Sequence, residues 1–151
     1  ATTFDALRSD TDLLTDAVSA SIRVKADIVE RDERESGDRR KLNLGHTLAH
    51  AIEKCTNRLN HGEAVAVGTA LIADASVKLG VLAAEDRDRI AGVLKKLGFD
   101  LTPPVDVKRL LKEVDKDKKN EDGMLRIVVP VGIGDCEVRR MSHDEFAALF
   151  A

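Results

Sequence analysis

Aromatic residues are scarce in this sequence, which has no tryptophan, no tyrosine and four phenylalanines among its 151 residues. Proteins that bind single-stranded nucleic acids stack the bases on aromatic side chains, so few platforms exist here for that kind of recognition. An excess of one charge is also lacking, because 24 Lys and Arg residues stand against 27 Asp and Glu residues. The resulting net charge of −3 predicts neither a nucleic-acid surface nor a membrane surface.

Cysteine is equally rare, and the two cysteines, Cys55 and Cys136, lie far apart. Neither belongs to a Cys-x-x-Cys pair, so we expect no zinc ribbon and no disulfide framework, but a reduced cytoplasmic protein. No hydrophobic run approaches the roughly 18 residues of a membrane span. The first residues lack the basic-then-apolar order of a signal peptide. Because the chain starts at Ala1 and soon becomes helical in character, we expect it to be part of a longer protein.

Apolar residues recur at helical spacing through most of the chain. Spacing, capping residues and glycine stops predict helices over residues 10–33, 43–55, 62–80, 83–98, 106–115 and 142–150. The helix over 62–80 is rich in alanine and glycine and should be buried against other helices. Residues 124–131 and 136–141 read as strands joined by the turn sequence GIGD. The predicted fold is mainly α, a multi-helix domain over residues 1–151 with a small β-hairpin near its C-terminus.

Three of the four histidines fall within sixteen residues, in segments that are otherwise apolar. His46 and His50 project from one face of a helix, about 6 Å apart along its axis. His61 opens the next helix, and a helix–turn–helix hairpin can bring it back beside that pair. Two imidazoles and one carboxylate would make a three-ligand catalytic zinc site with a place for substrate. The HxxxH pair alone is a weak signal, and structural or surface histidines are the simpler interpretation of it.

Polar residues around the histidines extend the pattern. Asn43 lies three residues before His46, and Arg39 lies four residues before Asn43, so they share the helical stripe if the helix starts a turn early. The charged run over residues 31–40, RDERESGDRR, is expected to be solvated. His143 lies in the polar capping segment SHDEF and is expected at the surface.

Four motifs, taken together and in order, resemble one family. They are VKADIVERDERESGDRRKLNLGHTLAHAIE (24–53), HGEAVAVG (61–68), DKKNEDG (117–123) and LRIVVPVGIG (125–134). Over nearly its whole length the chain resembles the C-terminal domain of 3-dehydroquinate synthase, a sugar-phosphate cyclase with a fold like that of glycerol dehydrogenase. The resemblance implies the C-terminal, metal- and substrate-binding lobe of a two-domain enzyme, whose NAD-binding N-terminal domain is absent from residues 1–151.

The resemblance also implies a role for each matching residue. His46 and His61 are expected to be metal ligands, and His50 is expected to lie beside the metal as a catalytic residue that assists proton transfer. The residues expected to contact the substrate are Lys25, also a catalytic candidate, Arg39, Asn43, Lys119 and, as second choice, Lys118. Cations suit the acidic sugar phosphate of this family, because Arg and Lys form charge-assisted hydrogen bonds with anions.

The implied reaction converts 3-deoxy-D-arabino-heptulosonate 7-phosphate to 3-dehydroquinate with loss of phosphate, a lyase step of the shikimate pathway to aromatic amino acids. It requires Zn²⁺, or another divalent cation such as Co²⁺, and NAD⁺ bound mainly by the N-terminal domain. The third metal ligand is a glutamate expected upstream of Ala1, and no glycine-rich dinucleotide-binding turn occurs in these residues. We therefore expect the isolated chain to be inactive, and the full enzyme to be a homodimer.

Two other functions fit parts of the pattern. Another sugar-phosphate cyclase, or a metal-dependent polyol dehydrogenase of the same fold, would share the histidines, although Arg39 and Lys119 favour an anionic substrate. A non-catalytic helical interaction module would use the histidines structurally. That third interpretation leaves the ordered series of motifs unexplained.

Overall fold

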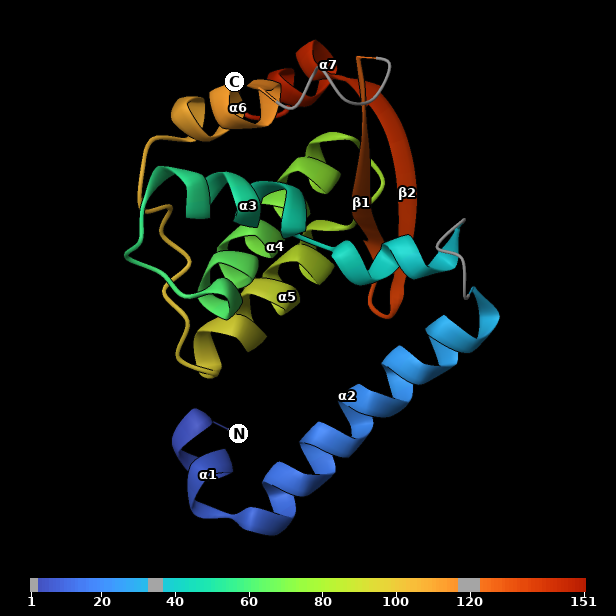
Figure 1. The fold of residues 1–151 in the computed structure, drawn as a ribbon, viewed down its shortest axis with the longest axis vertical. Coiled ribbons are helices and arrows are strands. Elements are labelled where there is room, and N and C mark those ends of the chain that lie inside the picture. The colour runs from blue at the N-terminus through green and yellow to red at the C-terminus, as the bar shows by residue number, and fades with distance from the viewer. Residues whose placement is uncertain (1–2, 33–36, 117–122) are drawn as a thin grey trace.

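The computed structural model describes residues 3–32, 37–116 and 123–151, which form a helical body, a β-hairpin beside it and a helical arm (Figure 1). The helices of the body are α3 (His46–Cys55), α4 (His61–Lys78), α5 (Ala84–Lys96), α6 (Val107–Lys116) and α7 (His143–Ala148). The strands β1 (Met124–Gly132) and β2 (Asp135–Ser142) pair in antiparallel fashion. This arrangement confirms the predicted mainly helical fold with a hairpin near the C-terminus. None of the described helices is long and apolar enough to cross a membrane.

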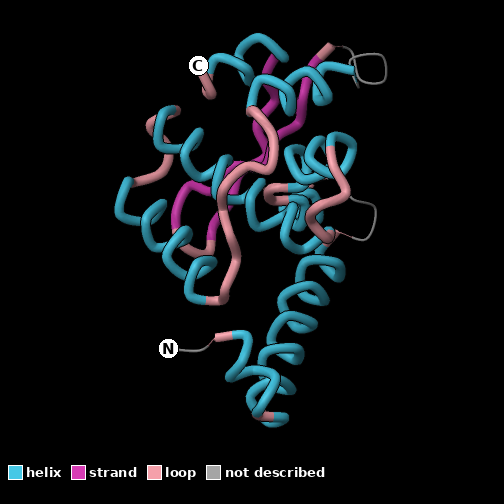
Figure 2. Tube along the Cα trace, turned by 90° about the vertical axis from the view of Figure 1, so that its left-hand side faces the viewer, coloured by secondary structure: helices cyan, strands magenta, loops and turns pink. Residues whose placement is uncertain are grey.

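The arm consists of α1 (Phe4–Ser9) and α2 (Thr11–Arg31), and it projects from the body in both views (Figure 1 and Figure 2). Asp10 caps α2, because its side chain accepts the N–H groups of Asp12 and Leu13. The short helix α1 turns back, and the Phe4 ring meets that of Phe99 edge to face with 5.2 Å between centroids. No residue of α2 is fully buried. The exposed large apolar side chains on α2 are Leu14, Val18, Ile22 and Val24.

The core lies around α4, which contacts α3, α5 and β1. The buried face of α4 consists mostly of small residues, namely Ala64, Ala66, Val67, Gly68, Ile72, Ala73, Ala75 and Ser76. Such a face lets neighbouring helices approach closely. The burial of these residues confirms the buried position predicted for this segment. Larger side chains fill the space around it, among them Leu48, Ile52, Leu110, Ile127 and Phe146. Burying each of these contributes about 1.5–3 kcal/mol.

The segment before α3 differs from the prediction. Residues 38–43 form a 3₁₀ helix, η1 (Asp38–Asn43), and the chain then turns at Gly45, whose φ of 79° is left-handed. The turn arises because Gly45 presses against α4, where a Cβ would lie 2.5 Å from Thr69 Oγ1 and 2.9 Å from the Val65 carbonyl oxygen. As α3 begins only after this turn, Arg39 and Asn43 do not share a continuous α-helical stripe with the histidines.

His143 is buried, so its predicted place at the surface is wrong. It is 5% exposed, and its Nδ1 lies 2.8 Å from Asp115 Oδ1 on α6, an ion pair when the imidazole is protonated. The capping motif does mark the helix start: Ser142 Oγ accepts the Glu145 N–H, and the Glu145 carboxylate accepts the Ser142 N–H. The motif fixes where α7 begins, but the packing of α6 decides which side chains face the core.

Candidate metal centre

Three histidines lie together at one end of two neighbouring helices. His46 is the first residue of α3, His50 follows one turn later, and His61 is the first residue of α4. Their ring centroids are 5.3 Å apart for His46 and His61, 5.8 Å for His46 and His50, and 6.2 Å for His50 and His61. The connection between α3 and α4 therefore brings the His61 ring close to the rings of His46 and His50. The roles of the three rings stay predictions.

The start of α4 is fixed by the residue before His61. Asn60 Oδ1 accepts the Glu63 N–H, and the Glu63 carboxylate accepts the Asn60 N–H. This reciprocal pair satisfies two N–H groups that have no partner within the helix. His61 follows directly, so its backbone belongs to a well-capped helix end.

Two glycines bring α3 and α4 together beneath the histidines. A Cβ on Gly68 would collide with the carbonyl oxygen of Gly45 and would lie 3.2 Å from the Ala49 nitrogen. Gly45 also directly precedes His46, so the closest contact of the two helices lies next to the site. The spacing of His46 and His61 thus depends on a crossing of α3 and α4 at which Gly68 lies against the backbone of Gly45.

One nitrogen of each of two rings has a defined partner. His46 Nδ1 lies 3.2 Å from the Leu44 carbonyl oxygen, and His61 Nδ1 lies 2.9 Å from Glu53 Oε1. A carbonyl or carboxylate oxygen accepts hydrogen bonds and does not donate them, so the proton of each neutral ring belongs on Nδ1. The Nε2 atoms then carry the lone pairs, which is the tautomer in which a histidine binds a metal through Nε2.

The spacing of His46 and His61 fits a shared metal ion. Two imidazoles bound at about 2.0–2.1 Å in tetrahedral geometry have ring centroids about 5 Å apart, and the observed separation is 5.3 Å. Both distances to His50 are longer, which favours His46 and His61 as the pair and His50 as their neighbour. Within the described ranges, no three His, Cys, Asp or Glu side chains are arranged to hold a metal. The third ligand implied by the resemblance stays a prediction.

The residues predicted to contact substrate come from separate parts of the chain. Arg39, half-buried, and Asn43, exposed, lie on η1, which leads into α3. Lys25 is exposed on α2, whose own contacts within the chain include η1. Lys118 and Lys119 lie outside the described residues. The structure thus places two of the predicted contacts on the element next to the histidines and one on the arm.

Sequence reasoning missed two carboxylates near this site. Glu53 lies three residues after His50, and the structure places its Oε1 atom 2.9 Å from His61 Nδ1. Asp32 belongs to the run expected to be solvated, yet it is 9% exposed and accepts hydrogen bonds from the chain before α3. The spacing of eight residues from Glu53 to His61 across a turn was the available signal for the first. The second had none, because its partners are the backbone N–H groups of Gly37 and Arg39, which carry no sequence signal.

Cys136 on β2 faces η1 but is poorly suited to bind metal or act as a nucleophile. It lines a cavity together with Asp38 and Lys41. Burial, and secondarily the charge of Asp135, raises the pKa of the Cys136 thiol. The thiol is therefore protonated at neutral pH, whereas the thiolate is the reactive and metal-binding form.

Taken together, the fold and the site define a helical lobe with a candidate centre for a divalent metal. Comparison with known proteins extends this description. The model of the family described as 3-dehydroquinate synthase C-terminal matches residues 2–120. The chain belongs to this family, which confirms the family expected from the motifs.

Curated relatives named 3-dehydroquinate synthase match most of the chain. The protein of Nitrosospira multiformis is 43% identical over 135 residues, covering 87% of this chain and 37% of the relative. That of Ruegeria pomeroyi is 46% identical over 134 residues, covering 82% and 36%, and that of Pelobacter propionicus is 40% identical over 146 residues, covering 95% and 41%. The chain thus spans 36–41% of the length of these relatives.

Two solved structures share the fold. One is 2-deoxy-scyllo-inosose synthase complexed with carbaglucose-6-phosphate, NAD⁺ and Co²⁺, with a TM-score of 0.76 and 21% identity over 87% of this chain and 39% of that one. The other is 2-epi-5-epi-valiolone synthase from Streptomyces hygroscopicus with NAD⁺ and Zn²⁺ bound, with a TM-score of 0.71 and 23% identity over 93% and 39%. At such identities the likeness shows the fold alone.

Proposed function

We propose that this chain is the C-terminal, metal- and substrate-binding lobe of a 3-dehydroquinate synthase. The full enzyme would convert 3-deoxy-D-arabino-heptulosonate 7-phosphate to 3-dehydroquinate and release phosphate. Family membership supports the choice of reaction. The observation that carries the proposal is the pair His46 and His61, whose Nδ1 atoms have acceptors and whose rings are 5.3 Å apart.

His46 and His61 would hold the cation through Nε2, with Zn²⁺ or Co²⁺ as the candidates, since structures of this fold carry one or the other. When bound, the metal acts as a Lewis acid toward a substrate hydroxyl or carbonyl group. NAD⁺ would be bound mainly by an N-terminal domain of the same enzyme. We propose two partners for this lobe: that N-terminal domain, and a second copy of the enzyme with which it forms a homodimer.

His50 would move a proton in this reaction. It neighbours both metal-binding rings and is exposed, so its imidazole is accessible to a bound substrate. A positioned histidine is the side chain most often used for proton transfer near neutral pH. Lys25, Arg39, Asn43 and the lysines at 118 and 119 would bind the phosphate, carboxylate and hydroxyl groups of the substrate. Cations suit that task because charge-assisted hydrogen bonds to such anions are strong.

The test is an assay of the full-length enzyme that contains this chain, supplied with NAD⁺ and Zn²⁺ or Co²⁺. We expect release of phosphate from the heptulosonate phosphate and a product with the mass of 3-dehydroquinate. Phosphate release only from another sugar phosphate, such as glucose 6-phosphate, would favour a different cyclase. Reduction of NAD⁺ by glycerol would favour a polyol dehydrogenase. Absence of both turnover and metal binding would favour the interaction module.

Glu53 gives a second prediction about the metal centre. Glu53→Ala in the full-length enzyme should weaken Zn²⁺ binding by about 10–100-fold, because the carboxylate holds His61 in its metal-binding tautomer and orientation. Glu53→Gln should have a smaller effect, since the amide oxygen still accepts the Nδ1–H but carries no charge. The measurement is calorimetric titration of Zn²⁺ into metal-free protein.

The matched control for this prediction is Glu85→Gln, which removes one acidic charge from the first turn of α5 and should leave Zn²⁺ affinity unchanged. If Glu53→Ala binds Zn²⁺ as tightly as the unmodified enzyme does, the carboxylate does not orient a ligand.

A further inference from the structure

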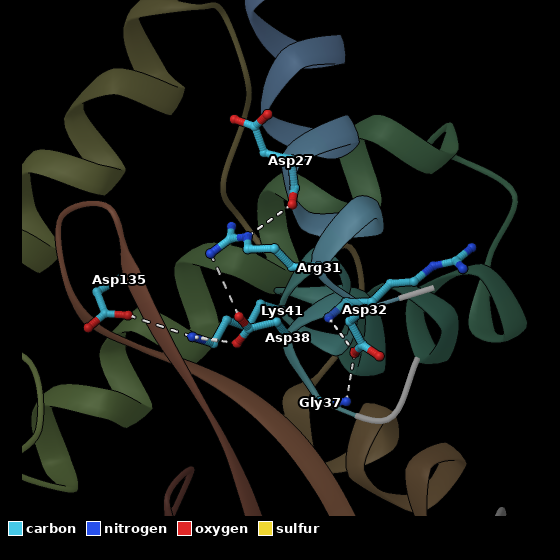
Figure 3. Close-up of polar contacts among 8 residues, drawn as sticks. Asp27, Arg31, Asp32, Gly37, Asp38, Lys41 and Asp135 are labelled. Carbon is cyan, nitrogen blue, oxygen red and sulfur yellow. Dashed lines mark hydrogen bonds and ion pairs between the residues drawn. The ribbon is translucent and has the colours of Figure 1, made fainter. Parts of the chain in front are cut away.

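Asp32 joins the end of α2 to the start of η1. Its backbone N–H donates to the carbonyl oxygens of Ile28 and Val29, which ends α2. Its side-chain Oδ2 accepts the N–H of Gly37 at 2.7 Å and the N–H of Arg39 at 3.0 Å. Figure 3 shows these two bonds converging on one carboxylate oxygen. Asp32 therefore both ends α2 and binds the backbone at the start of η1.

The burial of Asp32 makes these bonds a strong link between α2 and η1. The residue is 9% exposed, and carboxylates are rarely buried unless they are well paired. The ion pair that also joins α2 to η1 is of a weaker kind, because Arg31 and Asp38 approach only to 3.8 Å and both side chains are exposed (Figure 3). Exposed pairs are screened by water and salt, whereas charge-assisted bonds to a buried carboxylate are not.

The two elements that Asp32 connects carry three predicted substrate contacts, which are Lys25 on α2 and Arg39 and Asn43 on η1. Lys25 lies on α2, and Arg39 is the residue whose N–H the carboxylate binds. At its other end η1 leads through the Gly45 turn to His46. Two cations from separate elements bind one anion well only if both are held in register with it, and an error of about 1 Å can cost on the order of a hundredfold in rate.

We propose that Asp32 is a positioning residue of the substrate site. It fixes the backbone of Arg39 relative to the helix of Lys25, so that both cations meet the anionic groups of a substrate bound beside the metal. Asp32 itself touches neither substrate nor metal. The inference rests on the proposed function, because it takes Arg39 and Lys25 as substrate contacts.

The experiment compares Asp32→Asn and Asp32→Ala in the full-length enzyme. The probe is a non-reacting phosphonate analogue of the heptulosonate phosphate, and its dissociation constant is measured by calorimetry with NAD⁺ and Zn²⁺ bound. We expect the alanine variant to bind the analogue about 10–100-fold more weakly, the loss of about one charge-assisted hydrogen bond, and the asparagine variant to lie between it and the unmodified enzyme. KM should rise more than kcat falls, and Zn²⁺ affinity should not change.

Asp27→Asn is the matched control. It removes the same charge from α2, and its carboxylate points away from the network around Asp38 (Figure 3). This variant should bind the analogue like the unmodified enzyme. Hydrogen–deuterium exchange supplies a direct structural reading, because the amides of Gly37 and Arg39 should exchange faster in Asp32→Ala while those of α4 stay protected.

Three outcomes decide against the inference. If both Asp32 variants bind the analogue as tightly as the unmodified enzyme while Arg39→Ala binds it weakly, the positioning role is wrong and the proposed function stands. If the Asp32 variants lose Zn²⁺ and analogue affinity equally, the residue is only structural, and Asp32→Asn decides this even if Asp32→Ala does not fold. If the unmodified, metal-loaded enzyme neither turns over the substrate nor binds the analogue, the proposed function fails and this inference falls with it.

Discussion

His46→Ala is expected to remove tight metal binding from the full-length enzyme and, with it, the activity. The substitution deletes the Nε2 atom proposed as a metal ligand and leaves the Leu44 carbonyl oxygen without the ring N–H that it accepts. The loss of Zn²⁺ affinity should exceed the 10–100-fold that follows the loss of a residue behind a ligand. His61→Ala should behave in the same way. Metal content by elemental analysis and affinity by calorimetry measure the effect.

His50→Ala is the informative comparison for the two ligand variants. His50 lies near both rings, but at the longer distances of 5.8 and 6.2 Å. Its removal should leave metal content unchanged and lower kcat by about 10²–10⁴, the usual contribution of a proton-transferring side chain. Full metal content in His46→Ala, or loss of metal in His50→Ala, would reverse the roles proposed for these histidines.

Gly68→Ala is expected to cause a large loss of stability in this lobe. The new Cβ would collide with the carbonyl oxygen of Gly45. This atom belongs to the backbone and cannot rotate away, so α3 and α4 must separate. Overpacking of this kind typically costs about 1–3 kcal/mol, occasionally more. Because His46 follows Gly45 directly, Zn²⁺ affinity should fall together with the melting temperature of the full-length enzyme.

Gly92→Ala on α5 is the control for Gly68→Ala. A Cβ there meets no atom within 4 Å, and alanine in a helix is favoured over glycine by about 0.4–1 kcal/mol. The control should therefore raise the melting temperature slightly and leave Zn²⁺ affinity unchanged. Equal melting temperatures for the two variants, measured by calorimetry, would mean that the two helices can separate at little cost.

Local signals in the sequence located most elements of the fold. Asp10, Asn60 and Ser142 are capping residues, and each precedes a helix whose start it marks. The hairpin followed from strand-like segments around GIGD, because turn residues act locally. The grouping of the histidines followed from a spacing of four residues and a short turn.

Features that depend on distant contacts could not be predicted from the sequence. The helix break before His46 exists because Gly45 meets Val65 and Thr69 on another helix. His143 is buried because α6 covers it and places Asp115 beside it. The roles given to the site residues came from the family resemblance, since spacing alone cannot separate a ligand from a structural histidine.

The position of Lys25 along the arm has a mechanical consequence. α2 has 21 residues and is therefore about 30 Å long, and Lys25 lies only about 10 Å from the Asp32 end. A tilt of about 10° at that pivot would carry the far end about 5 Å, yet would displace the Lys25 backbone by less than about 2 Å. Lys25 thus lies close to the end of α2 about which the helix would tilt. Its position relative to a ligand therefore depends little on where the N-terminal end of the arm lies.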